Sequence, residues 1–453
     1  MVKRRIIFIL LAAALLAGAF KAAPARSFKV EFRQFQLENG LRVVLSEDHS
    51  APVVAVAVYY DVGSRNEVKG RTGFAHLFEH MMFQGSENVG KAEHFKYVES
   101  NGGTLQGTTH ADYTNYYEFL PSNKLELALW LESDRMRGLR ITTENLQNQK
   151  EAVKEEKRSS YDNQPYWPHL LKMDEMVFRN WANSHTPIGE MRDLDAATVE
   201  EVQAFFNTYY VPNNAVLAIA GDFVADQAES LVRKYFGTIP RRDRPPSIDV
   251  SEPEGVAVRK AVVEDRLAEM PALAIAWKIP PRRSKDSYAI ALLQALLFDG
   301  ESARVYRKLV KELAVSLEVT ATLEERRGPG QLALFTIHRP EVSAERVRAI
   351  IEGEIERIKK DGVRADELLK VKNQYRLGYF IDEDRGEQAS LPTPLGRALA
   401  LAEFTLFDND PSLINTEVDR YLAVTADEMR EAARNYFVDL NTAVLIINPA
   451  QQK

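Results

Sequence analysis

The stretches "TVEEVQAFFNTYYVPNNAVLAIAG" (198–221) and "TADEMREAARNYFVDLNTAVLIINP" (425–449) repeat one pattern in the two halves of the chain. A threonine, a tyrosine and a valine recur at a constant offset of 227 residues, beginning with Thr198 and Thr425. In both stretches an amphipathic helical pattern leads into a short apolar run, which is typical of a helix followed by a buried strand. The repeat therefore predicts a duplicated domain.

A fainter repeat lies near the start of each half, where "APVVAVAVYYDV" (51–62) resembles "MPALAIAWKIPP" (270–281). Apolar runs of this kind, such as "RVVLSED" (42–48), are typical of strands, whereas "NKLELALWLESDRMRGL" (123–139) has a helical period. The sequence thus predicts an α+β fold. Coincidence could produce either repeat alone, but two repeats in the same order favour duplication.

A segment without periodicity separates the two repeats. "RRDRPPSIDVSEPEGV" (241–256) is rich in proline and charge, which is typical of an interdomain linker. At 453 residues and 45% hydrophobic content, the chain is long enough for two cores. We therefore predict a first domain over 26–240, a linker over 241–256 and a second domain over 257–453.

The first 25 residues have the pattern of a secretory signal peptide. "KRR" (3–5) precedes an apolar stretch over 6–20, and the small residues Ala23-Pro24-Ala25 follow. The alternative is a membrane anchor, but a helix needs about 20 apolar residues to cross the hydrocarbon core. The sequence thus predicts an exported protein with no stable membrane anchor after cleavage, periplasmic in a Gram-negative bacterium.

Charge and cysteine content exclude several classes of partner. The net charge is −7, and it becomes more negative when the predicted signal peptide, which has four basic residues and no acid, is removed. Such a chain is a poor partner for nucleic acid or anionic lipid. Because the sequence contains no cysteine, disulfides and a lipid anchor on cysteine are excluded as well.

Three ionisable residues interrupt the apolar run "FAHLFEHMMF" (74–83). On a helix, His76 and His80 share one face because they are four residues apart, and Glu79 lies at the edge of that face. Zinc binds histidine nitrogens in such an arrangement. A buried polar cluster without metal is the alternative. Three ionisable side chains in an apolar helix would lose hydration unless something paired them, however, and a divalent cation does so.

The order H-x-x-E-H is the zinc motif of the inverzincins. With it, the chain resembles the insulinase and pitrilysin family of metallopeptidases, which includes mitochondrial processing peptidase subunits and bacterial periplasmic zinc peptidases. "LENGLRVVLSED", "VGSRNE", "SNGGTLQGTTHADYTNYYEFLP" and "YYVPNNAVLAIAGDF" also look like family blocks in family order. The resemblance implies two duplicated domains, each a mixed β-sheet packed with helices, that form one half of a clamshell peptidase.

The family takes a third zinc ligand from a glutamate about 76 residues after the second histidine, and Glu156 stands there in "EAVKEEKR". Catalytic zinc commonly has three protein ligands, and two histidines with one glutamate are an established set. Glu155 is the alternative ligand, and a solvated charged helix face is the alternative interpretation of this segment. The resemblance implies one Zn²⁺ per chain, bound by His76, His80 and Glu156.

These residues imply a zinc-dependent endopeptidase that hydrolyses extended peptides in an enclosed chamber. Glu79 is expected to act as the general base on the zinc-bound water and to pass the proton to the leaving amine. In the family, an extended peptide adds as a strand to a sheet edge near the zinc. The matching segment is "GGTLQGTT" (102–109), where Gly103, Gln106, Gly107 and Thr108 are candidate substrate-binding residues.

Two positions near this site depart from the family pattern. Gln106 stands where relatives commonly have asparagine, and Gln149 stands where many active relatives have a second glutamate. Because Gln149 is not expected to be a ligand, we predict an altered rate and not a loss of activity.

The second half departs more strongly. Its stretch "DSYAIALLQALLF" (286–298) corresponds in order to the zinc helix but has no histidine and no acid pair suited to a metal, so one active site per chain is expected. Family second halves usually supply an arginine and a tyrosine seven residues apart, where this chain has Lys308 and Val315. Lysine lacks the bidentate fork and valine has no hydroxyl. We therefore predict a heterodimer with a paralogous subunit that carries the pair, and a homodimer is the alternative.

Two other functions stay open from the residues alone. The chain could be a catalytically idle or supporting subunit of a peptidase complex, although such a subunit would not need Glu79 as a base. A two-histidine, one-carboxylate iron enzyme is the second alternative. The duplicated domains and the lack of a redox-cofactor motif in the sequence argue against it.

Overall fold

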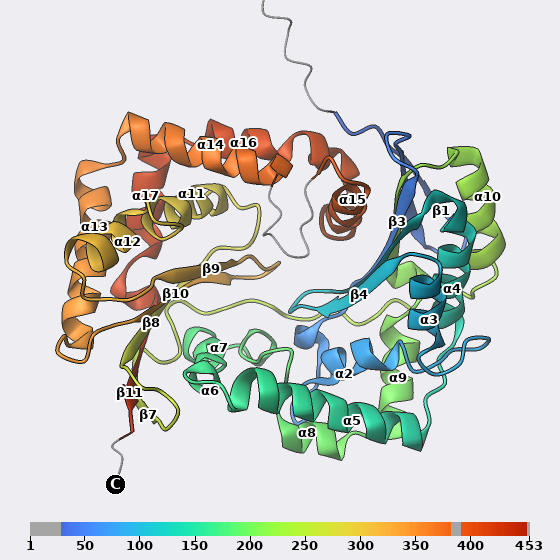
Figure 1. Ribbon diagram of the computed structural model, residues 1–453, viewed down its shortest axis with the longest axis horizontal. Coiled ribbons are helices and arrows are strands. Elements are labelled where there is room, and N and C mark those ends of the chain that lie inside the picture. The colour runs from blue at the N-terminus through green and yellow to red at the C-terminus, as the bar shows by residue number, and fades with distance from the viewer. Residues whose placement is uncertain (1–28, 382–390, 451–453) are drawn as a thin grey trace, which may run out of the picture. The chain divides into compact units, whose positions relative to one another are not determined.

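The computed structural model describes residues 29–381 and 391–450, and the signal peptide predicted over 1–25 lies outside these residues. The chain divides into two units, Met1–Glu31 and Phe32–Lys453, and the second contains every element described below. This unit is built on two β-sheets surrounded by helices (Figure 1). The arrangement confirms the predicted α+β fold class.

The first sheet has six strands in the order β1-β2-β6-β3-β5-β4. It is mixed, because β2 and β6 are parallel while all other neighbours are antiparallel. Its strands are β1 (Arg33–Gln36), β2 (Arg42–Glu47), β3 (Val53–Tyr60), β4 (Thr104–Thr109), β5 (Thr114–Pro121) and β6 (Ala215–Gly221).

The second sheet has five strands in the order β7-β11-β8-β10-β9, with β7 and β11 parallel and the other neighbours antiparallel. Its strands are β7 (Lys260–Asp265), β8 (Ala272–Ile279), β9 (Thr320–Glu324), β10 (Gly330–Ile337) and β11 (Thr442–Pro449). Apart from β1, the two sheets agree strand for strand in order and direction. The duplication predicted from the sequence is therefore confirmed, and β4 and β9 are matching edge strands.

The repeated sequence stretches form the same local structure in both halves. Helices α9 (Val199–Tyr209) and α17 (Ala426–Tyr436) each begin with a capping box, in which a threonine and a glutamate three residues later satisfy each other's backbone N–H groups. Each helix then leads through a short 3₁₀ turn into a central strand, β6 or β11.

Helices of both halves surround the sheets. The remaining helices of the first half are α2 (Phe74–Met81), α3 (Glu93–Ser100), α4 (Leu125–Arg137), α5 (Thr143–Lys157), α6 (Trp167–Leu170), α7 (Met173–Val177), α8 (Met191–Ala196) and α10 (Ala225–Phe236). Those of the second half are α11 (Ser287–Leu297), α12 (Arg304–Tyr306), α13 (Ala344–Asp361), α14 (Ala365–Ile381), α15 (Pro394–Asp408) and α16 (Glu417–Ala423). None of the helices in the described residues is long and apolar enough to span a membrane.

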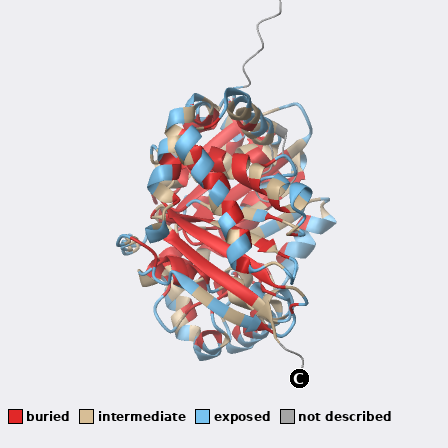
Figure 2. Cartoon of the chain, turned by 90° about the vertical axis from the view of Figure 1, so that its left-hand side faces the viewer, coloured by how far each residue is buried: buried red, intermediate tan, exposed pale blue. Residues whose placement is uncertain are grey.

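The central strands are buried along their whole length. Every residue of β6 and of β8 is buried, and Figure 2 shows buried strands behind helices whose outer surfaces are exposed. A strand without an exposed face needs cover on both sides of its sheet. Both sheets therefore require helices on each face.

Each half contributes a helix that packs on the sheet of the other half. Helix α15 of the second half packs on β3 and β6, while α7 of the first half packs on β8 and β11. Met176 and Val177 of α7 lie in one apolar cluster with Ala274 and Leu445 of the second sheet.

No helix or strand lies between α10 and β7, where a linker is predicted. The exact bounds 26–240, 241–256 and 257–453 stay a prediction, because residues from Phe32 on form one compact unit.

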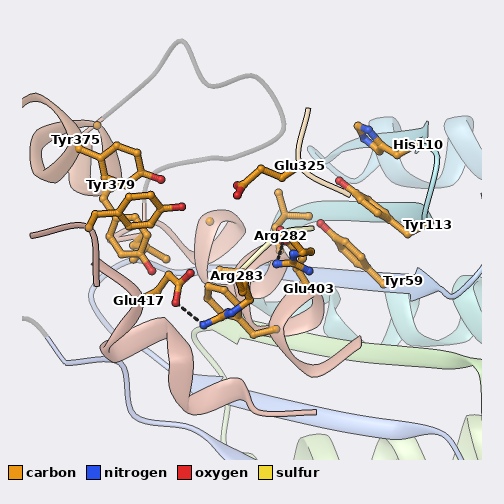
Figure 3. A pocket seen from close by; sticks show the side chains of 17 residues that line it. Tyr59, His110, Tyr113, Arg282, Arg283, Glu325, Tyr375, Tyr379, Glu403 and Glu417 are labelled. Atoms are coloured by element: carbon orange, nitrogen blue, oxygen red, sulfur yellow. Dashed lines mark hydrogen bonds and ion pairs between the residues drawn. The ribbon is translucent and has the colours of Figure 1, made fainter. Parts of the chain in front are cut away.

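Helix α15 also borders a pocket of about 390 Å³, which it shares with α14 and α16 (Figure 3). Side chains of the first sheet and its β4–β5 turn form another part of the wall. The exchange of helices thus creates a cavity whose walls come from both halves.

Candidate metal centre

Helices α2 and α5 carry the ionisable residues that the sequence singles out. Helix α2 begins after Gly73, whose φ of 82° is left-handed and suits glycine. Helix α5 begins after its N-cap Thr142, whose side chain accepts the N–H of Asn145. The two helices pack against each other. This packing brings His76 and His80 of α2 to the last turn of α5.

The structure brings His76, His80 and Glu156 together. The Nε2 atom of His76 lies 3.6 Å from Oε1 of Glu156, and the Nε2 atom of His80 lies 3.3 Å from Oε2. One ligand atom from each residue falls within 4.8 Å of the other two. Tetrahedral ligands at zinc distances of 2.0–2.1 Å lie about 3.3 Å apart, so the donor set fits Zn²⁺ with little movement.

Glu155, the alternative third ligand, points elsewhere. Its side chain is 69% exposed and pairs with Arg158 on the next turn of the chain, at 3.2 Å between Oε2 and Nη1. Neighbouring residues of a helix face about 100° apart, so only one of the two glutamates can face α2. In this structure that residue is Glu156.

The electrostatics of the cluster favour a bound cation. Burial and repulsion by His80 lower the pKa of His76 to about 4, so its imidazole is neutral at pH 7. Burial also opposes charge on His80, but a hydrogen bond with Glu156 and the charge of Glu79 outweigh it and raise the pKa. The His80 hydrogen bond in turn lowers the pKa of Glu156. Because the raised pKa of His80 favours its protonated form, a metal ion competes with a proton for this imidazole.

Gln149 lies beside this cluster and not in it. A hydrogen bond from its side chain is among the interactions that raise the pKa of His80. Gln149 thus contacts a candidate ligand from outside, where it can orient the imidazole ring.

Glu79 is held against the edge strand β4. The hydroxyl of Thr109, the last residue of β4, donates to Oε2 of Glu79 at 2.6 Å. A Cβ atom at Gly107 would lie 3.2 Å from Cγ of Glu79 and 3.0 Å from the ring of Tyr116. Glycine at this position therefore lets the strand approach the carboxylate closely.

The four predicted substrate-binding residues lie at or just before β4. Gln106, Gly107 and Thr108 pair with Tyr117, Tyr116 and Asn115 of β5, and the other side of β4 has no strand partner in the described residues. Gly103 precedes the strand, where a Cβ atom would lie 2.7 Å from the Leu120 side chain. A free strand edge beside the metal cluster can accept an extended peptide.

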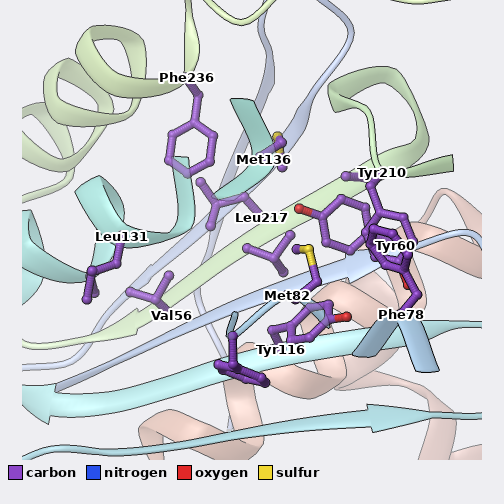
Figure 4. Close-up of a cluster of buried hydrophobic side chains, with 14 of the residues drawn as sticks. Val56, Tyr60, Phe78, Met82, Tyr116, Leu131, Met136, Tyr210, Leu217 and Phe236 are labelled. Carbon is purple, nitrogen blue, oxygen red and sulfur yellow. The ribbon is translucent and has the colours of Figure 1, made fainter. Parts of the chain in front are cut away.

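Aromatic packing fixes the opposite face of α2. The ring of Phe78 lies 4.1 Å from that of Tyr210, which in turn lies 4.7 Å from Tyr60 of β3 (Figure 4). All three side chains are buried. The apolar residues of the run 74–83 thus face the core, which leaves the ionisable residues on the side of β4 and α5.

A residue that the sequence analysis did not single out holds the start of α2. The buried carboxylate of Glu67 accepts the backbone N–H groups of Gly73 at 3.0 Å and Ala75 at 2.8 Å. Nε2 of His185 lies 3.2 Å from the same carboxylate. Glu67 therefore caps the helix that carries His76, Glu79 and His80.

His185 is an imidazolium in this arrangement. Its Nδ1 lies 2.8 Å from the carbonyl oxygen of Trp181, and its Nε2 lies 2.8 Å from that of Ser64. Both partners are acceptors, so both ring nitrogens must donate. Burial opposes this charge, but the hydrogen bond and charge of Glu67 raise the pKa of His185 above its usual value. "VGSRNE" (62–67) contains Glu67, but nothing in the sequence connects it to a histidine 118 residues later.

A second cluster of donors lies deeper in the first half. His94, Glu118 and Glu132 are buried and also lie within ligand distance of one another. Here Arg135 supplies the positive charge, because its Nε donates to Glu132 at 2.9 Å and its guanidinium lies 4.3 Å from the ring centre of Tyr116. Burial lowers the pKa of His94 to about 3. We interpret this cluster as a structural ion network, because the guanidinium takes the place that a cation would need.

The matching region of the second half has no such donors. Every residue of α11 is buried except Gln294 and Ala295, and the described residues of this half contain no group that could bind a metal. Lys308 pairs with Glu312 at 2.8 Å, and Val315 packs against the second core. Neither side chain offers what the family's arginine and tyrosine supply.

Comparison with known proteins agrees with this architecture. A family model described as insulinase (peptidase family M16) matches residues 42–184, and one described as the peptidase M16 inactive domain matches residues 196–375. Together they match well over half of the chain. The chain belongs to the insulinase family, peptidase family M16. The recognition made from the H-x-x-E-H motif and its neighbouring blocks is thereby confirmed.

Several known proteins are similar to nearly the whole chain. Zinc protease PqqE of Helicobacter pylori is 26% identical, over 94% of this chain and 94% of its own length. The crystal structure of a protease from Helicobacter pylori superposes with a TM-score of 0.86 at 25% identity, covering 93% of this chain and all of that one. The periplasmic protease PqqL of Escherichia coli shares the fold with a TM-score of 0.72 at 18% identity, covering 93% of this chain but 48% of its own. The chain therefore corresponds in fold to about half of that longer protease.

Proposed function

We propose that this protein is a zinc-dependent endopeptidase that hydrolyses extended peptides, with Zn²⁺ bound by His76, His80 and Glu156. The observation that carries the proposal is the convergence of their three ligand atoms beside the carboxylate of Glu79. The donor set of two imidazoles and one carboxylate is typical of catalytic zinc. Relatives named zinc proteases support the same metal.

The chemistry divides between the metal and Glu79. A bound Zn²⁺ would supply Lewis-acid catalysis and lower the pKa of a water molecule. Glu79 accepts the proton of the attacking water and delivers it to the leaving amine. The hydroxyl of Thr109 fixes one oxygen of Glu79, so the base keeps its orientation. The free edge of β4 aligns the peptide as an added strand, with its main chain beside Glu79.

A test combines metal analysis with peptide cleavage. The mature chain, alone and mixed with the product of a paralogous gene, is incubated with a peptide library, and cleavage is detected by mass spectrometry. Metal content is measured by inductively coupled plasma mass spectrometry. We expect one zinc per wild-type chain and cleavage by the wild-type chain in the mixture, and loss of both in His80→Ala. His49→Ala removes an exposed histidine elsewhere and is the matched control. Unchanged cleavage in His80→Ala contradicts the proposal.

The active form is proposed to be a heterodimer with a paralogous chain. The site lacks an arginine and a tyrosine from an opposing unit, and a second copy of this chain offers only Lys308, already paired with Glu312, and Val315. The match of this chain to half of PqqL supports a two-part assembly. Light scattering combined with cleavage assays tests this. A pure homodimer that cleaves peptides as fast as any mixture with a paralogue contradicts the heterodimer.

Export to the periplasm is part of the proposal and rests on the pattern of residues 1–25. Its test is the N-terminal sequence of the protein recovered from a periplasmic extract, which we expect to begin near residue 26.

A catalytically idle subunit is the alternative function. The match of residues 196–375 to an inactive domain fits either case, because that segment carries none of the candidate zinc ligands. Peptide cleavage by the metal-loaded heterodimer, lost in Glu79→Gln, separates the two.

A further inference from the structure

The pocket beside α15 is lined by aromatic rings on two sides. Figure 3 shows Tyr59 and Tyr113 of the first half on one side, and Tyr375 and Tyr379 of α14 on the other. Tyr59 and Tyr113 stack with 5.1 Å between ring centres, and His110 stacks on Tyr113 at 4.4 Å. At about 390 Å³ the pocket is large enough for one long side chain.

The two arginines of the pocket are already paired. Arg282 donates to Glu403 at 2.8 Å and lies over the ring of Phe407. Arg283 binds Glu417 and lies 3.3 Å from a carboxylate oxygen of Asp408. An anionic ligand would have to compete with these carboxylates for the arginines.

Glu325 is the acid of this pocket without a partner among the described residues. It makes no hydrogen bond or ion pair with any described residue, and Figure 3 shows its carboxyl group pointing into the pocket towards Tyr379. The side chain is exposed where it borders the pocket. The protein around it nevertheless desolvates the carboxyl group and raises its pKa to about 7; Arg282 opposes this shift, and Glu403 adds to it. Three acids and two arginines line the pocket, so its carboxyl groups outnumber its guanidinium groups.

The pocket lies next to the edge strand of the candidate metal centre. Strand β4 ends at Thr109, which binds Glu79, and the following residue His110 lines the pocket. In the second sheet, Glu325 directly follows the matching edge strand β9. A peptide strand paired along β4 advances about 3.3 Å per residue. Its side chains beyond the Thr109 end therefore come within reach of the pocket.

We propose that this pocket binds one basic side chain, lysine or arginine, of the peptide substrate on the Thr109 side of the cleaved bond. Aromatic faces attract a cation, and the carboxyl group of Glu325, which has no partner among the described residues, supplies its counter-charge. Tyrosine rings also cover the methylene stem of such a side chain. The inference rests on the proposed peptidase function and adds a preference for basic peptides to it.

The test compares peptides that differ in one charge. Arginine is placed at each position of an acetylated, internally quenched peptide and replaced in turn by citrulline, which has the same shape without the charge. Arginine at one position is expected to raise kcat/KM by about tenfold over citrulline, the size of a charge-assisted hydrogen bond. In Glu325→Gln the ratio should fall close to one. Glu264→Gln, an exposed acid on β7, is the control and should keep the preference.

Binding is measured separately from hydrolysis. Fluorescence anisotropy of the same peptides on the full-length Glu79→Gln chain, with and without Glu325→Gln, tests the pocket even if no peptide is cleaved. Loss of the arginine preference in the double variant supports the pocket, and absence of cleavage then contradicts only the peptidase function. An unchanged arginine preference in Glu325→Gln overturns the inference. A preference for glutamate, or one that requires a free peptide N-terminus, overturns it as well.

Discussion

Helices α2 and α11 hold matching places in the two halves. Each follows the strand, β3 or β8, that pairs antiparallel with the central strand β6 or β11. On α2, three ionisable side chains face α5 and β4, while on α11 the buried residues are nearly all apolar. Helix α5 brings Glu156 to α2, whereas α14, its counterpart in order, contributes Tyr375 and Tyr379 to a pocket. The same backbone scaffold thus supports a metal cluster in one half and an aromatic, acidic cavity in the other.

The comparison shows which residues convert a packing helix into a candidate active site. The duplicated fold supplies the helix, the edge strand and the aromatic support. The first half adds the donor residues, a glycine that lets β4 approach, and the Glu67–His185 pair that caps α2. Changes to these additions should remove function and leave the shared scaffold intact.

The largest effect is expected from the proposed base. Glu79→Gln keeps the size and shape of the side chain but cannot accept the proton, so turnover should fall by about 10² to 10⁴. Zinc content and the circular dichroism spectrum should match the wild type, because the ligands are unchanged. Gln294→Ala, a substitution on the matching helix α11, should leave turnover intact. Wild-type turnover in Glu79→Gln would show that another group acts as the base.

The exchange of α7 and α15 predicts that neither half folds alone. A fragment of residues 26–240 would expose the face of β3 and β6 that α15 covers, and would leave α7 without the second sheet. We expect no cooperative thermal transition in the fragment by circular dichroism, in contrast to the full chain. A sharp transition near the melting temperature of the full chain would contradict the exchange.

The cap of α2 should contribute to stability and to activity together. Glu67→Gln leaves the buried imidazolium of His185 without its counter-charge, which is expected to cost about 3 kcal/mol in the free energy of unfolding. Urea denaturation measures this, with the exposed Glu38→Gln as a control. Zinc affinity should fall as well, because α2 carries two ligands. Equal stability of both variants would refute the role of Glu67.

A smaller effect is expected at the edge strand. In Gly107→Ala the added methyl group would lie within 3.2 Å of Glu79 and displace either the base or β4, so kcat should fall by about tenfold. Zinc content should not change. Gly353→Ala in α13 meets no atom within 4 Å and should keep full activity. If both variants are equally active, the close approach of β4 has no catalytic consequence.

The sequence predicts most of the scaffold and part of the site. The Thr198 and Thr425 repeats predict the duplication because capping boxes and apolar runs are local patterns. His76 and His80 follow from helical spacing alone, whereas Glu156 required the family resemblance, since no local pattern sets it apart from Glu155. The structure distinguishes the two glutamates, because the side chain of Glu156 faces His80 whereas that of Glu155 pairs with Arg158.

Other features depend on tertiary contacts that leave no local pattern. Glu67 meets His185 across 118 residues of chain, and the imidazolium is evident only from two carbonyl oxygens that surround the ring. The apolar positions of α15 are those of any buried helix, so the sequence does not tell which sheet it covers. That Glu325 has no partner among residues 29–381 and 391–450 likewise depends on where its neighbours lie.

The most direct measurement is the zinc content of the purified mature chain and its variants. We expect one zinc per chain in the wild type, in Glu79→Gln and in Glu155→Ala. We expect near zero in His76→Ala, His80→Ala and Glu156→Ala. Equal zinc in all of these proteins, or zinc lost in Glu155→Ala and kept in Glu156→Ala, would contradict the proposed zinc site.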